Sequence, residues 1–424
     1  MQRLLYVAVL LLLIVSGPVL AQSVEKTEPA EPFSRELIER GSLFNNWLGA
    51  GEKLQEQGIT IGLYATHVYQ INLQGGLSTN SRSGRHAGSY DLEVELDFEK
   101  LFGLRGASMF VGAEGSWGEG LNPESVGSLF GVNDDAGGDR SIDVTSLYYQ
   151  QVLLDGRLRF RVGKQDLTGG FEVQDRPATF DGNAYANDET TQFLNSALVN
   201  NPTVPFPEDG LAVSMLAEPV DGWYVGAAVA DAQADARETG LNTAFHGPDY
   251  FFSVLETGLA TSWESARGEL PGMYRLGMWY DPQPKQRFRS TSVKRDDIGF
   301  YVSVDQMIYR ESAGDRQGLG LFGRYGYADD DVNEIEHFWS AGLQYRGLVP
   351  TRDMDVLGFG IARGRLADGA GFTADHETAC ELYYNALVTG WLSVTPSVQL
   401  IRNPGGDSSV DDALVMGLRL QIAF

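Results

Sequence analysis

Charged side chains recur at every second position in two stretches of the chain, where an extended backbone would gather them on one face. They are Arg159 and Arg161, followed by Lys164, in GRLRFRVGKQ, and Glu93, Glu95 and Asp97 in YDLEVELDFEK. A guanidinium offers a planar fork of hydrogen-bond donors, and carboxylates accept hydrogen bonds. Together these residues could bind a polar solute reversibly, without covalent chemistry.

The sequence carries no recognisable motif for catalysis. It lacks HExxH, CxxC and GxSxG patterns. The histidines are scattered, at His67, His86, His246, His337 and His376. We therefore predict that the protein is not an enzyme, although a set of Ser, His and Asp brought together only in space is an alternative that the sequence leaves open.

Two acidic runs raise the question of a metal site. NDDAGGD, residues 133–139, and ADDDVN, residues 328–333, both lack the ligand spacing of an EF-hand loop. Such runs usually face water, so we interpret them as solvated loop segments. We predict no resident metal and no cofactor.

We call Arg159, Arg161 and Lys164 the basic ladder, and Glu93, Glu95 and Asp97 the acidic ladder. Both would lie on strands that have one apolar and one polar face. Near the C-terminus, LSVTPSVQL and LRLQIAF repeat the alternation of the two ladders. A soluble β-sandwich would hide the apolar faces, whereas a transmembrane barrel would turn them to lipid and its polar faces to an aqueous interior. Segments of about ten residues favour the barrel. In this interpretation Leu158, Phe160 and Val162 face lipid, while Arg159 and Arg161 face water.

We predict an all-β fold, a transmembrane antiparallel β-barrel of about 16 strands. The strands are expected at 59–73, 88–99, 105–117, 143–154, 157–167, 209–217, 223–231, 250–261, 273–281, 298–308, 318–328, 336–346, 354–364, 378–388, 391–402 and 412–424. Their connections alternate between short turns and long loops such as 118–142 and 168–208, which is typical of outer-membrane barrels.

The N-terminus indicates export. Arg3 precedes an apolar run from Leu4 to Val15, and a small-residue ending leads to Ala21, so residues 1–21 have the layout of a cleaved signal peptide. Cys380 is the single cysteine, so paired disulfides do not stabilise the chain. The formal net charge of −25 argues against nucleic acid as a partner.

Several blocks of the sequence, in order, resemble the carbohydrate-selective porin family of the OprB type. They include RVGKQD with GFEVQDRPATF, LPGMYRLGMWYD, GFYVSVDQMIYR, GLGLFGRYGYA and YRGLVPTRDMDVLGFGIARGRL. The resemblance runs from about Leu43 to the end and implies a sixteen-stranded outer-membrane barrel that passes sugars by facilitated diffusion. Asn46-Trp47-Leu48-Gly49 departs from the family's usual Asp-Trp-Gly-Gly, and the long loop lacks the cysteine pair that members often carry.

The expected organisation follows. Residues 1–21 form the signal peptide, 22–42 a flexible periplasmic segment, and 43–424 the barrel, with a short helix at 43–58 before the first strand. Since 168–208 is too long for a simple connection, we expect it to fold into the barrel and narrow it. It would present Glu172, Asp175, Arg176 and Asp181 to the solute. Arg275 and Trp279 share a strand face and could form a sliding surface for a sugar ring.

The functional prediction is a sugar-permeable porin in the outer membrane of a Gram-negative-type bacterium. The alternatives are a general or cation-preferring diffusion porin, and a soluble sandwich that binds carbohydrate without a pore. Expected partners are sugars as transported solute and outer-membrane lipid and lipopolysaccharide. Metal-bridged contact with lipopolysaccharide is the alternative interpretation of an acidic run on the long-loop side. The chain could act as a homotrimer or a monomer.

Overall fold

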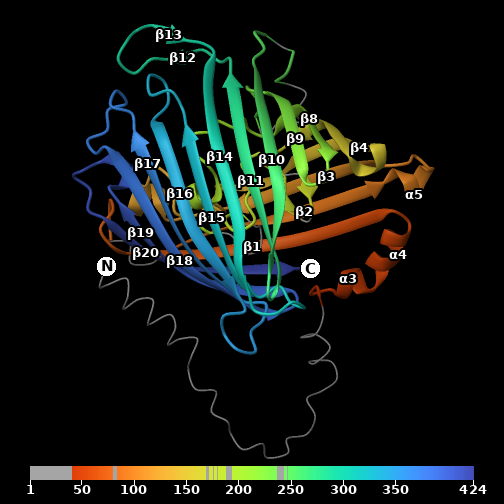
Figure 1. Ribbon diagram of the computed structural model, residues 1–424. Helices are drawn as coiled ribbons and strands as arrows, with labels where there is room; N and C mark the ends of the chain where they lie inside the picture. The colour runs from red at the N-terminus through yellow and green to blue at the C-terminus, as the bar shows by residue number, and fades with distance from the viewer. Residues whose placement is uncertain are drawn as a thin grey trace, which may run out of the picture.

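The alternating segments form a closed antiparallel barrel of sixteen strands (Figure 1). Hydrogen bonds between the first strand, β1 (Ile59–Gln74), and the last, β20 (Ala413–Ala423), close the sheet. The structure is a computed structural model that describes residues 41–79, 84–168, 171–174, 176–178, 180–187, 193–235, 243–245 and 247–424. The predicted signal peptide and most of the predicted periplasmic segment lie outside the described residues.

Each predicted strand overlaps one of the sixteen in the barrel. Between β1 and β20 the wall contains β2 (Arg85–Asp97), β3 (Ala107–Trp117), β4 (Arg140–Leu153), β5 (Leu158–Gln165), β8 (Gly210–Val220), β9 (Trp223–Asp231), β10 (Phe251–Ser265), β11 (Gly268–Asp281), β14 (Asp297–Arg310), β15 (Gly318–Tyr327), β16 (Ile335–Arg346), β17 (Val356–Leu366), β18 (His376–Thr389) and β19 (Leu392–Arg402). The largest difference is at β11, which begins at Gly268 rather than 273. Its first residues include Pro271 and two glycines, which obscure a strand pattern.

The two faces of the wall have the chemistry of a membrane barrel. On β11, Leu276 and Met278 are 55% and 50% exposed, whereas Arg275 and Trp279 on the opposite face are almost completely buried. The apolar side chains therefore point out of the barrel and the polar ones point in, the reverse of a soluble sandwich. On β5, Val162 is exposed and pairs with Val213, as expected for a lipid-facing position.

Connections on the two ends of the barrel differ in length. At one end, residues 221–222, 266–267 and 390–391 form tight turns, while at the other end 118–139, 166–209 and 232–250 are long loops. The predicted alternation of short and long connections is therefore present. Short turns face the periplasm in outer-membrane barrels.

The short N-terminal helix is present in two pieces, α3 (Asn45–Leu48) and α4 (Ala50–Glu56). They meet at Gly49, whose φ of 80° a residue without a side chain adopts readily. The other helices are α5 (Phe98–Phe102), α6 (Ser196–Val199), and the single turns η1 (Asn122–Val126), η2 (Leu154–Gly156) and η3 (Pro404–Gly406). Over the ranges that the structure describes, the helices are too short or too polar to cross a bilayer.

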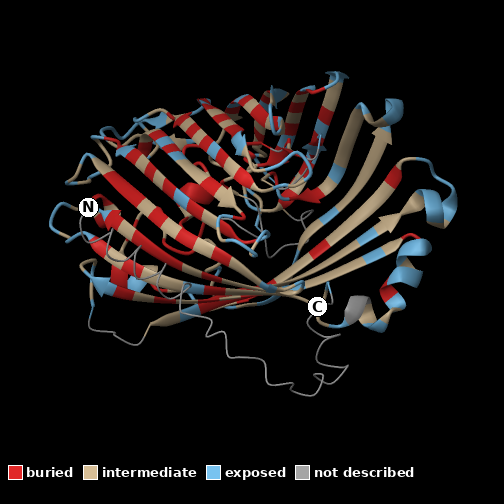
Figure 2. Ribbon diagram, turned by 60° about the horizontal axis from the view of Figure 1, so that its bottom comes forward, coloured by how far each residue is buried: buried red, intermediate tan, exposed pale blue. Residues whose placement is uncertain are grey.

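Two long loops fold against the inner face of the barrel and form a core there. Phe130 and Val132 of the 118–139 loop, and Phe193 and Leu198 of the 166–209 loop, pack with wall residues such as Phe338. The second loop also contains a two-stranded sheet, β6 (Glu172–Val173) with β7 (Arg176–Pro177). Buried residues alternate along the strands that these loops cover, whereas the strands beside α4 and α5 are mostly half-buried (Figure 2).

Candidate pore lining

Asp305 of β14 joins the 166–209 loop to the wall. Its carboxylate pairs with Arg176 of the loop and with Arg275 of β11, the latter at 2.7 Å. Arg176 also donates to the carbonyl oxygen of Pro271 (2.8 Å), and Arg275 donates to that of Pro177 (2.6 Å). All three charged side chains are at least nine-tenths buried. A buried charge is costly unless it is paired and hydrogen-bonded, so this triad fixes the loop to the barrel.

A second buried carboxylate, Glu256 of β10, holds the next part of the loop. It accepts hydrogen bonds from the Tyr301 hydroxyl (2.7 Å), the Tyr224 hydroxyl and the backbone N–H of Asp181 (3.0 Å). Arg324 of β15 donates to backbone oxygens of the same loop, at Asp181 (3.0 Å) and Val199 (2.7 Å).

Two carboxylates of β18 repeat this arrangement. Glu381 accepts from the backbone N–H groups of Leu194 (3.0 Å) and Asn195 (2.8 Å) in the 166–209 loop. Glu377 accepts from Ser128, Leu129 and Phe130 of the 118–139 loop, and also from Gly405. We call the inner face of β10, β11 and β14–β19, with these anchors, the loop-covered wall.

The loop-covered wall changes the interpretation of four predicted solute-contacting residues. Arg176, Asp181, Arg275 and Trp279 are 7%, 3%, 2% and 1% exposed. Their side chains are enclosed between loop and wall, so Arg275 and Trp279 do not form the open sliding surface that the sequence predicted. A shared strand face was visible in the sequence, but the loop that covers it was not. Asp175 lies outside the described residues.

The inner face of β2–β5, which we call the open wall, is more accessible. Arg161 donates from Nε to Gln150 Oε1 (2.8 Å), and its guanidinium lies 4.2 Å from the ring centre of Phe171 and 4.7 Å from that of Tyr148. Arg159 donates to the backbone oxygen of Glu172, whose side chain is exposed. The predicted arginine pair thus lies beside the start of the 166–209 loop.

The predicted acidic ladder lies on the neighbouring strand. Glu93 is half-buried and Glu95 is exposed, and Glu95 is near enough to Arg161 to interact with it electrostatically. Asp97 does not extend the ladder. Its carboxylate caps α5 by accepting from the backbone N–H groups of Glu99 (2.9 Å) and Lys100 (3.1 Å), because the strand ends there.

Lys164 also departs from its predicted ladder. It is three positions from Arg161, pairs in register with Leu147 and Leu211, and is 3% exposed. The preceding Gly163 has a φ of 138°, which interrupts the regular strand geometry. Arg159 and Arg161 therefore form the accessible part of the basic ladder.

Carboxylates converge at the loop end of the open wall. Glu114 of β3 interacts electrostatically with Arg140 and also with three carboxylates from different segments, Asp135, Asp166 and Asp143. Burial, with Asp166 nearby, raises the pKa of Asp209 to about 7. Burial, with Asp135 nearby, likewise raises the pKa of Asp134 to about 7. The sequence analysis did not single out this cluster, because its members are far apart in the chain.

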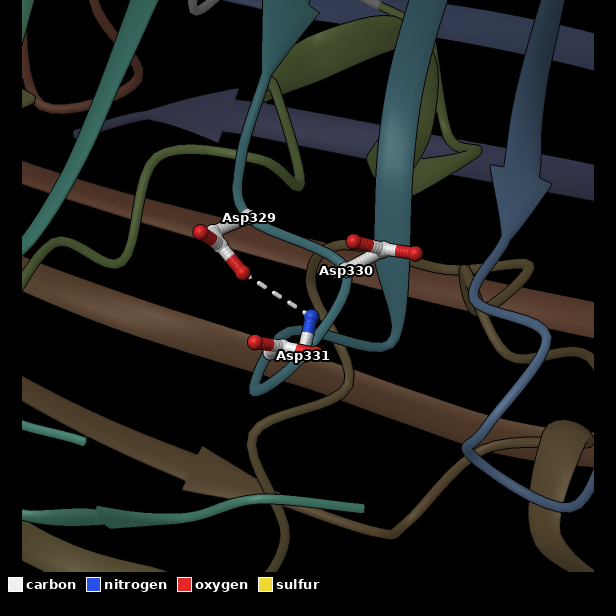
Figure 3. A group of neighbouring side chains, drawn as sticks. All are labelled: Asp329, Asp330 and Asp331. Carbon is white, nitrogen blue, oxygen red and sulfur yellow. Dashed lines mark hydrogen bonds between the residues drawn. The ribbon is translucent and has the colours of Figure 1, made fainter. Parts of the chain in front are cut away.

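The acidic run at 328–333 brings Asp329, Asp330 and Asp331 together between β15 and β16 (Figure 3). Asp329 accepts a hydrogen bond from the backbone N–H of Asp331 (2.9 Å) and pairs with Lys294 (2.7 Å), while Asp331 pairs with Arg287. Basic side chains of the neighbouring loop thus already compensate this cluster.

Comparisons with known proteins show the family of this chain. The sequence model of the carbohydrate-selective porin, OprB family, matches residues 81–424. Porin B of Pseudomonas aeruginosa is 25% identical, over 90% of this chain and 91% of that protein. A structure of Pseudomonas putida OprB at high pH superposes with a TM-score of 0.78 at 22% identity, covering 91% of this chain and 99% of that one. The low-pH structure of the same protein gives a TM-score of 0.58.

Proposed function

Because the chain belongs to the carbohydrate-selective porin, OprB family, we propose that its barrel passes neutral sugars across the outer membrane along the open wall, beside the in-folded 166–209 loop. The observation that carries this proposal is the difference in burial between the two sides of the lumen. Glu93, Glu95, Arg159 and Arg161 remain accessible, whereas the inner residues of β14, such as Tyr301, Ser303 and Asp305, are completely buried.

The open wall has the chemistry that sugar passage requires. Arg161 supplies donors, Glu93 and Glu95 supply acceptors, and the rings of Tyr148 and Phe171 offer apolar faces next to them. A sugar ring has polar hydroxyls and apolar C–H faces, so it can exchange contacts with all three. Passage through a channel requires that each of these contacts be weak enough to release the solute.

In this proposal the 166–209 loop is the constriction. Its anchors to Asp305, Glu256, Arg324 and Glu381 keep it against the far wall. Near its start, Phe171 contacts Arg161 and Glu172 contacts Arg159. The position of this loop would therefore set the width of the path beside β5.

Swelling of liposomes that contain the refolded protein tests the function directly. Glucose, maltose and longer maltooligosaccharides should enter at rates that fall steeply with size, while an amino acid of glucose-like size enters more slowly. Equal rates for sugars and size-matched solutes would contradict carbohydrate selectivity, and would leave a general diffusion porin.

The convergence of Glu114, Asp135, Asp166 and Asp209 favours a second property, a preference for cations over anions. Carboxylates at a mouth raise the local concentration of cations. Reversal potentials in a potassium chloride gradient measure this preference, and a value near zero would exclude it. Contact with lipopolysaccharide and assembly as a homotrimer remain proposals that extraction in mild detergent followed by native mass determination would test.

A further inference from the structure

A cavity of about 350 Å³ opens at the long-loop end of the barrel, on the side of β9–β11 rather than at the open wall. The end of the 166–209 loop, residues 205–208, forms one side of it, and the connections that follow β9 and β11 form the others. Its volume lies at the lower end of the range of about 300–1,000 Å³ for small-molecule sites. We propose that this cavity is an outer docking site for a sugar ring, separate from the path along the open wall. The proposal rests on the proposed function.

Two aromatic rings and two prolines form the apolar side of the cavity. The Phe252 ring is 1% exposed and stacks on Trp279, with 6.5 Å between ring centres. Phe206 packs edge-on against Phe252 at 6.0 Å and is itself only half-buried. Pro205 and Pro207 flank Phe206 and restrict its backbone. Phe206 is thus held in place while part of its ring remains accessible, which suits the C–H face of a sugar.

Hydrogen-bond acceptors form the polar rim. Gln283 is fixed because its side-chain Nε2 donates to the carbonyl oxygen of Ala232 (2.8 Å) and its backbone N–H donates to Asp281 (3.0 Å). Within the described part of the chain, its Oε1 has no bonding partner. Glu208 is exposed and, within the same ranges, its carboxylate forms no hydrogen bond or ion pair.

The charges of the rim select the class of ligand. Lys285 is already paired with Asp281 (3.0 Å) and Asp297 (2.8 Å), so it offers little to an anion. Glu208 and Gln283 instead present acceptors to a molecule that carries O–H donors. An apolar ligand would displace water from both acceptors without replacing its hydrogen bonds, at a cost in free energy. A neutral polyhydroxylated ring matches both the rim and the aromatic side.

Sugar-induced current noise in a planar bilayer tests the docking site, because it reports association from each side of the membrane separately. With maltose added on the long-loop side, Phe206→Ala should lower the association rate about two- to tenfold. Addition from the turn side should give an unchanged rate. Phe206→Leu keeps the packing on Phe252 and should show most of the same loss if the aromatic face matters. Glu208→Gln should have a smaller effect in the same direction.

Phe245→Ala is the matched control, since Phe245 is 70% exposed in the neighbouring loop and does not line the cavity. It should leave association from both sides unchanged. If wild-type protein passes maltose but Phe206→Ala and Phe206→Leu behave as wild type, the docking site is wrong and the porin function stands. If wild-type protein passes no sugar at all, the proposed function fails first.

Discussion

The two sides of the lumen use charged residues in opposite ways. On the loop-covered wall, Asp305, Glu256, Glu377 and Glu381 are buried, and each binds a long loop through its carboxylate; Asp305 and Glu256 also bind neighbouring wall residues. On the open wall, Glu93, Glu95, Arg159 and Arg161 keep part of theirs accessible. Side chains of the same types therefore serve as fixed anchors on one side and as exchangeable contacts on the other. Burial, rather than residue type, separates the two roles.

Removing the central anchor should have the largest effect. Asp305→Ala would leave Arg176 and Arg275 buried without their shared carboxylate, and breaking a buried pair in this way costs about 3–5 kcal/mol. We expect higher single-channel conductance, because the loop loses one of its attachments to the wall. The temperature above which the protein migrates as an unfolded chain on a gel should fall. Glu95→Ala on the open wall is the control and should not change that temperature. If Asp305→Ala and Glu95→Ala changed the conductance and this temperature equally, the distinction between an anchoring wall and an open wall would be wrong.

A smaller loss is expected for the other loop. Glu377→Gln replaces one accepting oxygen by a donor, which cannot serve the backbone N–H groups of Leu129, Phe130 and Gly405 together. The cost should be about 1–3 kcal/mol. Limited proteolysis of intact proteoliposomes should then cut the 118–139 loop faster than in wild type. In the control variant Glu334→Gln, at an exposed loop position, the 118–139 loop should be cut at the wild-type rate. If the loop were cut faster in both variants, Glu377 would have no special role in holding it.

On the open wall, substitutions should alter transport and leave stability intact. Arg161→Ala removes the cation between Tyr148 and Phe171, and glucose flux into liposomes should fall about two- to tenfold. Arg161→Lys keeps the charge but loses the planar fork of donors, so its glucose flux should lie between that of the wild type and that of Arg161→Ala. The double variant Arg159→Ala, Arg161→Ala with unchanged flux and selectivity would exclude the basic ladder from the transport path.

The carboxylates at the loop end should make cation preference depend on pH. Asp209 and Asp134 each have a pKa of about 7, raised chiefly by burial, so both are charged above that pH and neutral below it. Reversal potentials should indicate weaker cation preference as pH falls from 8 to 6. Asp209→Asn should flatten this dependence. A profile that is level across the range would show that these groups do not act on permeating ions.

The smallest effect is expected from chelation. Lys294 and Arg287 already pair with Asp329 and Asp331, so the acidic run between β15 and β16 needs no cation to hold it together. EDTA should leave conductance and heat-modified migration unchanged in detergent-purified protein. A clear shift that calcium reverses would instead indicate a metal site in this loop.

Alternation of polar and apolar residues predicted the strands, and the length of the segments together with the alternating short and long connections favoured a barrel of about 16 strands over a sandwich. It failed at strand ends and irregularities, where Asp97 caps a helix and Lys164 follows an irregular glycine. It also could not identify Asp305, Glu256 or Glu381 as anchors, because the loop groups that they bind are 75 to 187 positions away in the chain. The pairing of Arg176 with Asp305 depends on how the loop folds inward, which local periodicity does not specify.

The hydrogen bonds between β1 and β20 make the integrity of the pore depend on the most distant parts of the chain. Fourteen intervening strands can be added one beside another through local pairing. The final row of pairs, such as His67 with Leu420, instead joins residues that are 340 to 359 positions apart in the chain. Until that row forms, both outermost strands present unpaired backbone groups, which hydrocarbon does not tolerate. Shortening the last strand should therefore abolish membrane insertion as a whole rather than weaken one edge of the sheet.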